Sequence, residues 1–387
     1  MTRVAAAECP PPEAAVAPPV HDLLTLKKVA FKDLPGWVDD KHSEAVPSFL
    51  NSCAKLAKLG DAEAVGHDGH GGVAKQWRGA CAAAAKVKTG DDKAARTFFE
   101  TEFVPYQASG KSGPIGKLTG YFVQEVNASR KQTGKYQYPL YARPSDLVMV
   151  DLSLFVSDAH GRRLWGRHDD KGTLQPYFTR AEIRKGALAT QKLEIMYADD
   201  PIDVLFAHIE GSAVAVMDDG SRVRLEFNGK NGRSYKGVGK VLKEMGVLTG
   251  KYNGTMPGIR QYLADHMAKF DELVDQNASF VFFKESTAPG AMGSQDVVLT
   301  ARRSMAVDRA FIAHSTPIWV DGKAPSPGKP GASTWRSLLI AQDTGGGILG
   351  AVRGDIYWGE GAVAEELAGR MGGPGRYWVL LPTGVTK

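Results

Sequence analysis

The sequence lacks several features that would assign it to a class at once. No apolar run approaches the roughly 20 residues that span a bilayer, so we expect no transmembrane helix. No apolar signal segment stands at the N-terminus, so we expect that any secretion signal is absent from this chain or has been removed. Lys and Arg form no run interleaved with aromatic residues, which makes nucleic acid a weak candidate as a partner. The net charge of +5 would suit an acidic polymer, but it is equally typical of an ordinary solvated surface.

Cysteine is also scarce, with three residues in 387. Cys9 lies in an Ala- and Pro-rich leader, whereas Cys53 and Cys81 lie in two segments with helical periodicity. The two sulfurs could meet across packed helices as a disulfide, which would indicate an oxidising compartment. They could equally be two buried free thiols, and the residues alone leave both alternatives open.

Hydrophobic periodicity divides the chain into a helical part and a strand-rich part. Residues 45–103 repeat with a helical period, and from residue 116 short aromatic and β-branched segments broken by Gly and Pro predict strands. Residues 201–229 are predicted to form three strands, and residues 256–277 one long amphipathic helix. Residues 287–387 carry six short strand-like segments, "DVVLT" at 296–300 among them, and one short helix, a pattern typical of a small barrel that could borrow a strand from near Gly120.

These patterns predict a mainly β protein with a helical N-terminal segment and an inserted second domain. We place a flexible leader at 1–24 and a helical segment leading into the first domain at 25–122. An inserted β-rich domain follows at 123–286, and residues 287–387 complete the first domain as a barrel.

The candidate chemistry lies in "AQDTGGGILGAVRGDIYWGEG", residues 341–361. Strand alternation places Leu339, Ala341 and Asp343 on one face, and Asp355 shares a face with Tyr357. Glycine weakens strands, so the many glycines indicate bends or a close approach of a ligand to the backbone. An Asp that opens a strand is nevertheless more often a turn residue than a catalyst.

Asp308, in "MAVDRAFI", is a third acid of this kind. Its neighbour Arg309 could neutralise it, which would give it a purely structural role. Aromatic residues gather around Tyr121, Tyr138 and Tyr357, where they could stack on sugar rings, although core packing explains most such positions.

Nine short motifs occur in the order and spacing of one enzyme family, across roughly residues 116–382. The motifs are "LTGYF", "YQYPLYARP", "FTRAEI", "DPIDVLFAHIEGS", "GKNGRSYKGVGKVL", "MPGIRQYL", "FVFFKE", "RSMAVDRAFIAHSTPIWVD" and "IAQDTGGGILGAVRGDIYWGEG". Together they resemble the membrane-bound lytic murein transglycosylase A family (MltA family). The paired Cys53 and Cys81 also look like a pair that some members carry.

The resemblance implies a double-psi β-barrel with an inserted second β-domain and a glycan groove between them. It implies cleavage of the β-1,4 bond between N-acetylmuramic acid and N-acetylglucosamine in peptidoglycan, without water, leaving a 1,6-anhydromuramyl end. The catalytic acid of the family matches Asp355, and Asp343 and Asp308 match acids expected to support it. The residues that match its sugar-binding wall are Thr119, Gly120, Tyr121, Gln342, Gly345, Gly346 and Tyr357.

The chain departs from the family pattern in two places. Gly347 replaces the usual small residue of "GGAI", a mild change. The segment "HIEGSA" puts His208, Glu210 and Ala213 where the family has Gln, Gln and Gly, which puts the sugar contacts there in doubt.

Two other functions remain open from the sequence. Barrels of this kind also host inverting hydrolases that use two carboxyl groups, and Asp343 with Asp355 would supply them. A non-catalytic, expansin-like barrel that binds cell wall is the other alternative, since fold alone does not decide function.

The resemblance also implies a location and partners. We expect a periplasmic or outer-membrane-associated monomer that binds peptidoglycan glycan strands and could take part in a wall-remodelling complex. The sequence implies no metal and no organic cofactor.

Overall fold

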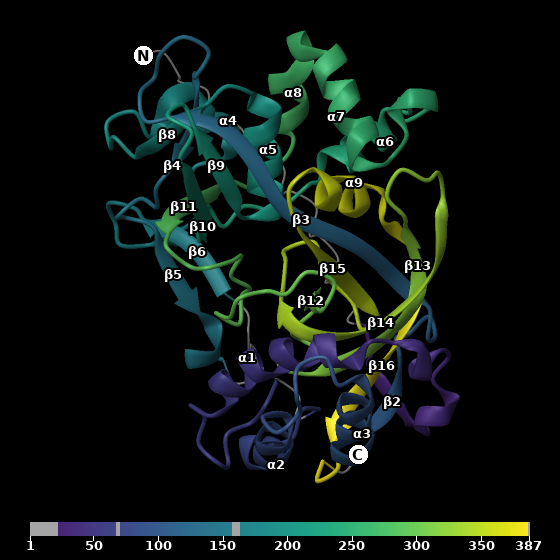
Figure 1. Ribbon diagram of the computed structural model, residues 1–387. Helices are drawn as coiled ribbons and strands as arrows, with labels where there is room; N and C mark the ends of the chain where they lie inside the picture. The colour runs from purple at the N-terminus through teal and green to yellow at the C-terminus, as the bar shows by residue number, and fades with distance from the viewer. Residues whose placement is uncertain (1–21, 67–69, 157–162, 386–387) are drawn as a thin grey trace, which may run out of the picture.

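The computed structural model describes residues 22–66, 70–156 and 163–385, and the expected leader, 1–24, falls outside it up to residue 21. The described chain is rich in β-strands, with helices gathered at the two ends of the molecule in Figure 1. Within the described ranges, none of the helices has the length and apolar character needed to cross a lipid bilayer.

The helical N-terminal segment is confirmed as three helices separated by loops. They are α1 (Val46–Leu56), α2 (Ala74–Ala84) and α3 (Asp92–Glu102). A disulfide between Cys53 and Cys81 joins α1 to α2, which decides the alternative that the sequence left open. Buried aromatic residues of these helices, Phe49, Trp77 and Phe99, share one core cluster with Trp319 and Trp378 of the strands.

Six strands pair in a closed circuit. The order of pairing is β16–β13–β14–β12–β15–β3, and β3 pairs back to β16. The strands are β3 (Gly116–Ser129), β12 (Ser304–Val307), β13 (Pro317–Pro325), β14 (Ala332–Asp343), β15 (Arg353–Glu360) and β16 (Gly372–Pro382). Strand β2 (Phe103–Ser109) pairs with β16, and β1 (Thr25–Lys28) pairs with β2. The prediction that a segment near Gly120 joins the C-terminal strands is therefore confirmed.

Strand β3 continues out of this circuit into a second group of strands, as Figure 1 shows. Its second half pairs with β9 (Ala213–Met217) and β8 (Glu194–Ala198). The same group contains β4 (Tyr138–Tyr141), β10 (Arg222–Lys230) and β11 (Val281–Ser286). A separate three-stranded sheet consists of β5 (Val148–Asp151), β6 (Arg163–His168) and β7 (Leu174–Gln175).

Helices cover this second part. They are α4 (Arg180–Glu182), α5 (Pro201–Glu210), α6 (Val238–Glu244), α7 (Met256–Asp265) and α8 (Phe270–Asp275). A capping box starts α4, because the Thr179 side chain accepts from the backbone N–H of Glu182 and the Glu182 carboxylate accepts from that of Thr179. The last helix, α9 (Ala362–Arg370), follows β15 and packs against β3 and β15.

Three secondary-structure predictions were wrong. Residues 201–210 form helix α5 rather than a strand, because Asp200 caps its first turn, Pro201 opens it and Gly211 ends it in the left-handed conformation. The helix predicted over 256–277 is interrupted at His266, because the backbone of this residue, between α7 and α8, is not helical. Residues 296–300 form no strand and make only an isolated bridge through Val298.

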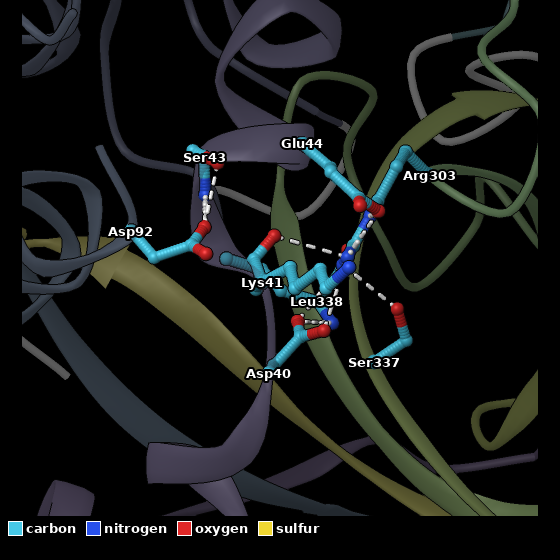
Figure 2. Close-up of polar contacts among 8 residues, drawn as sticks. All are labelled: Asp40, Lys41, Ser43, Glu44, Asp92, Arg303, Ser337 and Leu338. Atoms are coloured by element: carbon cyan, nitrogen blue, oxygen red, sulfur yellow. Dashed lines mark hydrogen bonds and ion pairs between the residues drawn. The ribbon is translucent and has the colours of Figure 1, made fainter. Parts of the chain in front are cut away.

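A buried ion-pair cluster fastens the N-terminal segment to the strands (Figure 2). The guanidinium of Arg303, just before β12, donates to both carboxylate oxygens of Asp40 at 2.8 and 3.0 Å and to Glu44 at 2.9 Å. It also donates to the hydroxyl of Ser337 and to two backbone carbonyls. Every side of this buried cation is therefore occupied, which is the condition under which a buried charge is tolerated.

Candidate active site

Four neighbouring strands bring two aspartates into one row. The registers pair Thr119 of β3 with Asp355 of β15, Asp355 with Ala306 of β12, and Ala306 with Asp343 of β14. Paired residues point to the same face of a sheet, so all four side chains project from the outer face of the strand circuit. The next residue on β15, Ile356, points inward to the buried core. The row places Asp355 and Asp343 on either side of one small residue.

A β-bulge at Gln342 is what aims Asp343 outward. Strand β12 pairs Met305 with Ala341 but Ala306 with Asp343, so Gln342 is an extra residue in β14. The prediction that Asp343 shares a face with Leu339 and Ala341 was therefore wrong, because those two residues point into the core. Without the bulge, the alternation of β14 would turn the Asp343 carboxyl inward.

Asp355 has few partners. Its carboxylate accepts a hydrogen bond of 2.5 Å from the Thr119 hydroxyl, and no described cation lies within ion-pair distance of it. Part of the residue remains open to solvent. Burial of the carboxyl raises the pKa of Asp355, with Asp343 adding a smaller like-charge effect, whereas Arg353 and the Thr119 hydroxyl lower it. The net effect favours the protonated acid.

Asp343 is held by three hydrogen-bond donors. Its carboxylate accepts from the Tyr121 hydroxyl, the Ser294 backbone N–H and the Thr344 backbone N–H, each at 2.8 Å. Burial raises the pKa of Asp343, and these three bonds oppose the rise. Burial and the nearby Asp343 raise the pKa of Tyr121 well above its usual value, so its hydroxyl keeps its proton and donates. The two carboxyls thus have different surroundings, and Asp355 is the one free to exchange a proton.

Asp308 lies outside the row. It accepts from the backbone N–H groups of Ala310 and Gly350, at 3.0 and 2.7 Å, so it ties the turn after β12 to the start of the β15 hairpin. No ion pair joins it to Arg309 among the described residues, so the proposed neutralisation by Arg309 was wrong. Asp308 therefore fixes the glycine-rich loop, and its supporting part in catalysis stays a prediction.

Two residues predicted to contact sugar, Gln342 and Tyr357, are buried, and a third, Gly120, is partly exposed. Gln342 is fully buried, donates to the Ser48 carbonyl and the Ser52 hydroxyl of α1, and accepts from Ser304. A Cβ on Gly120 would lie 2.5 Å from the Trp358 ring nitrogen, so this glycine serves packing. Tyr357 is 3% exposed and its ring packs 5.3 Å from that of Tyr121. Burial of Gln342 and Tyr357 argues against direct sugar contact by these two side chains, whereas contact at Gly120 stays a prediction.

The glycine-rich loop after β14 does lie at the surface. Gly346 is exposed, a Cβ there would meet no atom within 4 Å, and Gly345 is partly exposed. Neither has a positive φ, so the backbone itself does not require glycine at these two positions. Bare backbone beside Asp343 is consistent with the close approach of an external ligand.

Sequence reasoning missed two residues beside Asp343. Ser294 donates its backbone N–H to the carboxylate, and its hydroxyl lies 3.3 Å from the His314 ring. Burial lowers the pKa of His314 to about 3, so the ring is neutral at ordinary pH. Ser294 lies in a Gly- and Ser-containing loop without periodicity, so no sequence pattern marked it. Within the described ranges, no group of three His, Cys, Asp or Glu residues could hold a metal ion.

Comparison with known proteins places the chain in a family. One family profile, "MltA specific insert domain", matches residues 117–284, and a second, "3D domain", matches residues 303–381. The crystal structure of a membrane-bound lytic murein transglycosylase from Agrobacterium tumefaciens is similar with a TM-score of 0.80 and 30% identity, over 92% of this chain and 98% of that one. This chain belongs to the MltA family.

Other members of the family are also similar to this chain. The membrane-bound lytic murein transglycosylase A of Vibrio cholerae is 37% identical over 68% of this chain, and the match spans 64% of the V. cholerae protein. The match to the Escherichia coli relative spans 65% of that protein. The E. coli MltA crystal structure with bound chitohexaose is similar with a TM-score of 0.64 and 26% identity, over 87% of this chain and 90% of that one. The chain thus spans somewhat less than two thirds of these two curated MltA proteins.

Proposed function

We propose that this chain is a lytic transglycosylase that cleaves peptidoglycan between N-acetylmuramic acid and N-acetylglucosamine and leaves a 1,6-anhydromuramyl end. Membership of the MltA family and the names of its relatives support the reaction class. The observation that carries the proposal is the row of Thr119, Asp355 and Asp343, in which one acid is poised to hold a proton. The reaction needs no cofactor.

Asp355 acts first as the general acid. Its raised pKa allows the carboxyl to keep a proton near neutral pH, and the Thr119 hydroxyl orients it. The proton goes to the oxygen that bridges the two sugars as that oxygen leaves the anomeric carbon. Positive charge then develops on the sugar ring. Asp343, held by Tyr121, supplies a fixed negative charge nearby that stabilises it.

Asp355 then acts as the base. Its carboxylate removes the proton from the C6 hydroxyl of the same sugar while that oxygen bonds to the anomeric carbon. Bonds and protons balance, because the leaving sugar gains the proton that Asp355 lost and the C6 hydroxyl returns one. Attack within one sugar has the proximity advantage of an intramolecular reaction, which reaches about 7–11 kcal/mol in well-oriented cases. One carboxyl therefore does the work that hydrolases divide between two.

We propose the finer architecture in the same terms. The closed circuit of six strands supports a double-psi β-barrel built from residues 25–122 and 287–387. Residues 123–286 form the inserted β-rich domain, close to the range of the family's insert. The glycan lies along the outer face of the row, against Thr119, Tyr121, Gly345 and Gly346, with Asp308 holding the loop from behind.

Location and partners follow from the substrate. Peptidoglycan lies outside the cytoplasmic membrane, so we place the protein in the periplasm or at the outer membrane, in line with the membrane-bound names of its relatives. It acts as a monomer on glycan strands, and membership of a wall-remodelling complex is a further proposal.

An inverting hydrolase is the second candidate, favoured by the spacing of the two acids. Two strand steps separate Asp355 from Asp343, which places their backbones about 10 Å apart. Inverting enzymes keep their carboxyls about 6.5–9.5 Å apart to admit a water. Against this role, all three hydrogen bonds to Asp343 lower its basicity.

Digestion of purified sacculi tests the function. The wild type and Asp355→Asn are compared by mass spectrometry of the released muropeptides, with Asp39→Asn, an exposed aspartate of the N-terminal segment, as the matched control. We expect anhydro ends, lighter by one water than hydrolysed ends, from the wild type and the control only. Hydrolysed ends would show a hydrolase. Binding without cleavage would show the non-catalytic alternative.

A further inference from the structure

A third carboxyl, that of Glu210, lies beside the row. Glu210 is the last residue of α5, and Gly211 turns the chain into β9, which pairs with β3 from Gln124 onward. The turn places the Glu210 carboxyl against the backbone N–H of Phe122. This is the point at which β3 leaves β15 and meets β9, three residues along from Thr119 and one from Tyr121. Glu210 is partly open to solvent there.

The charges that face Glu210 are negative. Among the described residues they are Asp355 on β15 and Glu365 on α9, and the Tyr235 hydroxyl from the loop before α6 is a further titratable neighbour. The cation on the adjacent helix α7, Arg260, forms an ion pair of 2.6 Å with Asp203 and lies 3.7 Å from Glu365. Arg353 and Lys117 face Asp355 instead. Burial and these like charges raise the pKa of Glu210 well above its usual value.

The protonation state of Glu210 decides what it can bind. A neutral carboxylic acid offers one O–H donor and one carbonyl acceptor, the same pair that a glutamine amide offers. A carboxylate only accepts, and here it would add a negative charge beside Asp355. In the described part of the chain no side chain forms a hydrogen bond with Glu210, so no side-chain acceptor is paired with the donor of the neutral form.

We propose that Glu210 is a substrate-binding residue whose neutral form donates a hydrogen bond to a sugar oxygen next to Asp355, and whose ionisation releases that sugar. The proposal rests on the proposed function, because it assumes that the glycan lies along the row. If Glu210 acts in this way, glycan binding weakens at alkaline pH. The cause is then a residue that takes no part in bond cleavage. A Glu210→Gln variant keeps the donor at every pH.

Binding of chitohexaose, measured by titration calorimetry on the full chain, separates the two states. The range from about pH 4 to about pH 9 covers both the ordinary pKa of Glu and the values documented for buried Glu. We expect wild-type binding to weaken by about tenfold over this range, the effect of one lost hydrogen bond. Glu210→Gln should bind throughout as the wild type does at low pH. The matched control, Glu272→Gln on the exposed face of α8, should follow the wild type.

The outcomes are distinguishable. An equal alkaline loss of binding in Glu210→Gln and the wild type would overturn the inference, and so would an absence of chitohexaose binding at every pH. Glu210→Ala should bind weakly throughout the range, while thermal unfolding shows that it is folded. Sacculus digestion at low pH is the separate arm: hydrolysed products there would overturn the reaction and leave the binding role of Glu210 intact.

Discussion

The two ends of strand β12 hold charge in opposite ways. Just before the strand begins, Arg303 is 5% exposed and meets two carboxylates, a hydroxyl and two carbonyls (Figure 2). Three residues later, Ala306 lies between Asp355 and Asp343, and among the described residues neither carboxyl forms an ion pair. One end has a cation with every partner it can use, and the other has acids without a cation.

This difference separates a structural charge from the acid that we propose is reactive. A buried ion with complete partners keeps its charge, and removal of either side leaves the other exposed to a strong desolvation cost. A carboxyl held in low-polarity surroundings without a cation has a raised pKa and can exchange its proton near neutral pH. The first arrangement stabilises the fold, and the second weakens it slightly in return for reactivity. Substitution of Asp355 should therefore lower activity and leave stability intact, whereas substitution of Arg303 should lower stability and leave activity intact.

Replacement of Asp355 by Asn should have the largest effect, on activity alone. General acid–base groups contribute about 10²–10⁴-fold, so release of anhydro muropeptides should fall by at least about 10²-fold. Stability should hold or rise. Since the pKa of Asp355 is raised in the folded state, its ionisation costs stability at every pH above the unfolded pKa, and Asn removes that cost.

Thermal unfolding at about pH 7, above the ordinary Asp pKa, measures the second half of this prediction. A melting temperature clearly below that of the wild type would show that the Asp355 carboxylate is structural, like Asp40. The comparison between the two ends of β12 would then fail.

Replacement of Arg303 by Met should lower stability and leave activity unchanged. Breaking a buried ion pair from one side costs about 3–5 kcal/mol, because Asp40 is left buried without its cation. We expect the free energy of unfolding in urea to fall by that amount, while the folded fraction keeps its activity. The control is Arg336→Met, whose ion pair with Asp321 is partly exposed and should be worth less than about 1 kcal/mol. Equal losses in the two variants would contradict the buried role of Arg303.

Loss of the disulfide should have a smaller, purely structural effect. The Cys53–Cys81 bond closes a loop of 28 residues between α1 and α2, and the chain-entropy model assigns such a loop about 3.6 kcal/mol. The double variant Cys53→Ser, Cys81→Ser should lose about that much stability in urea and gain no further sensitivity to reductant. Activity should persist below the new melting temperature, because neither cysteine is part of the acid row. A wild-type stability in urea that does not change when reductant is added would contradict the presence of the disulfide.

The sequence predicted the strands that carry the two acids better than the direction in which their side chains point. Motif order indicated Asp355 and Asp343, and the hydrophobic pattern found most of the strands that carry them. Residues 201–210 were misread because their apolar content suits a strand as well as a helix, and only the caps at Asp200 and Gly211 distinguish the two. Local patterns give element type when the caps are considered together with the period.

The direction in which individual side chains point was less predictable. The bulge at Gln342 reverses the alternation of β14, and its cause is a hydrogen-bond set with Ser48 and Ser304, far away in the sequence. Gly120 packs on Trp358, which no local pattern reveals. Contacts between distant segments decide these positions, so a strand's period alone does not predict which side chains reach the glycan.

The smallest effect should come from the hydroxyl that touches the reactive acid. Thr119→Val keeps the shape of the side chain but removes the donor to Asp355. Because that hydrogen bond lowers the pKa of Asp355, its loss should raise the pKa further, and the acid should stay protonated to higher pH. The alkaline limb of kcat/KM should therefore move upward, by less than about one pH unit, with a severalfold lower maximum from poorer orientation. Thr119→Ser retains the donor and should retain the wild-type profile. A downward shift of the alkaline limb in Thr119→Val would mean that the hydroxyl accepts a hydrogen bond from protonated Asp355 rather than donating one to the carboxylate. The site would then resemble the Arg303 end of β12, where the polar partners stabilise a single charge state.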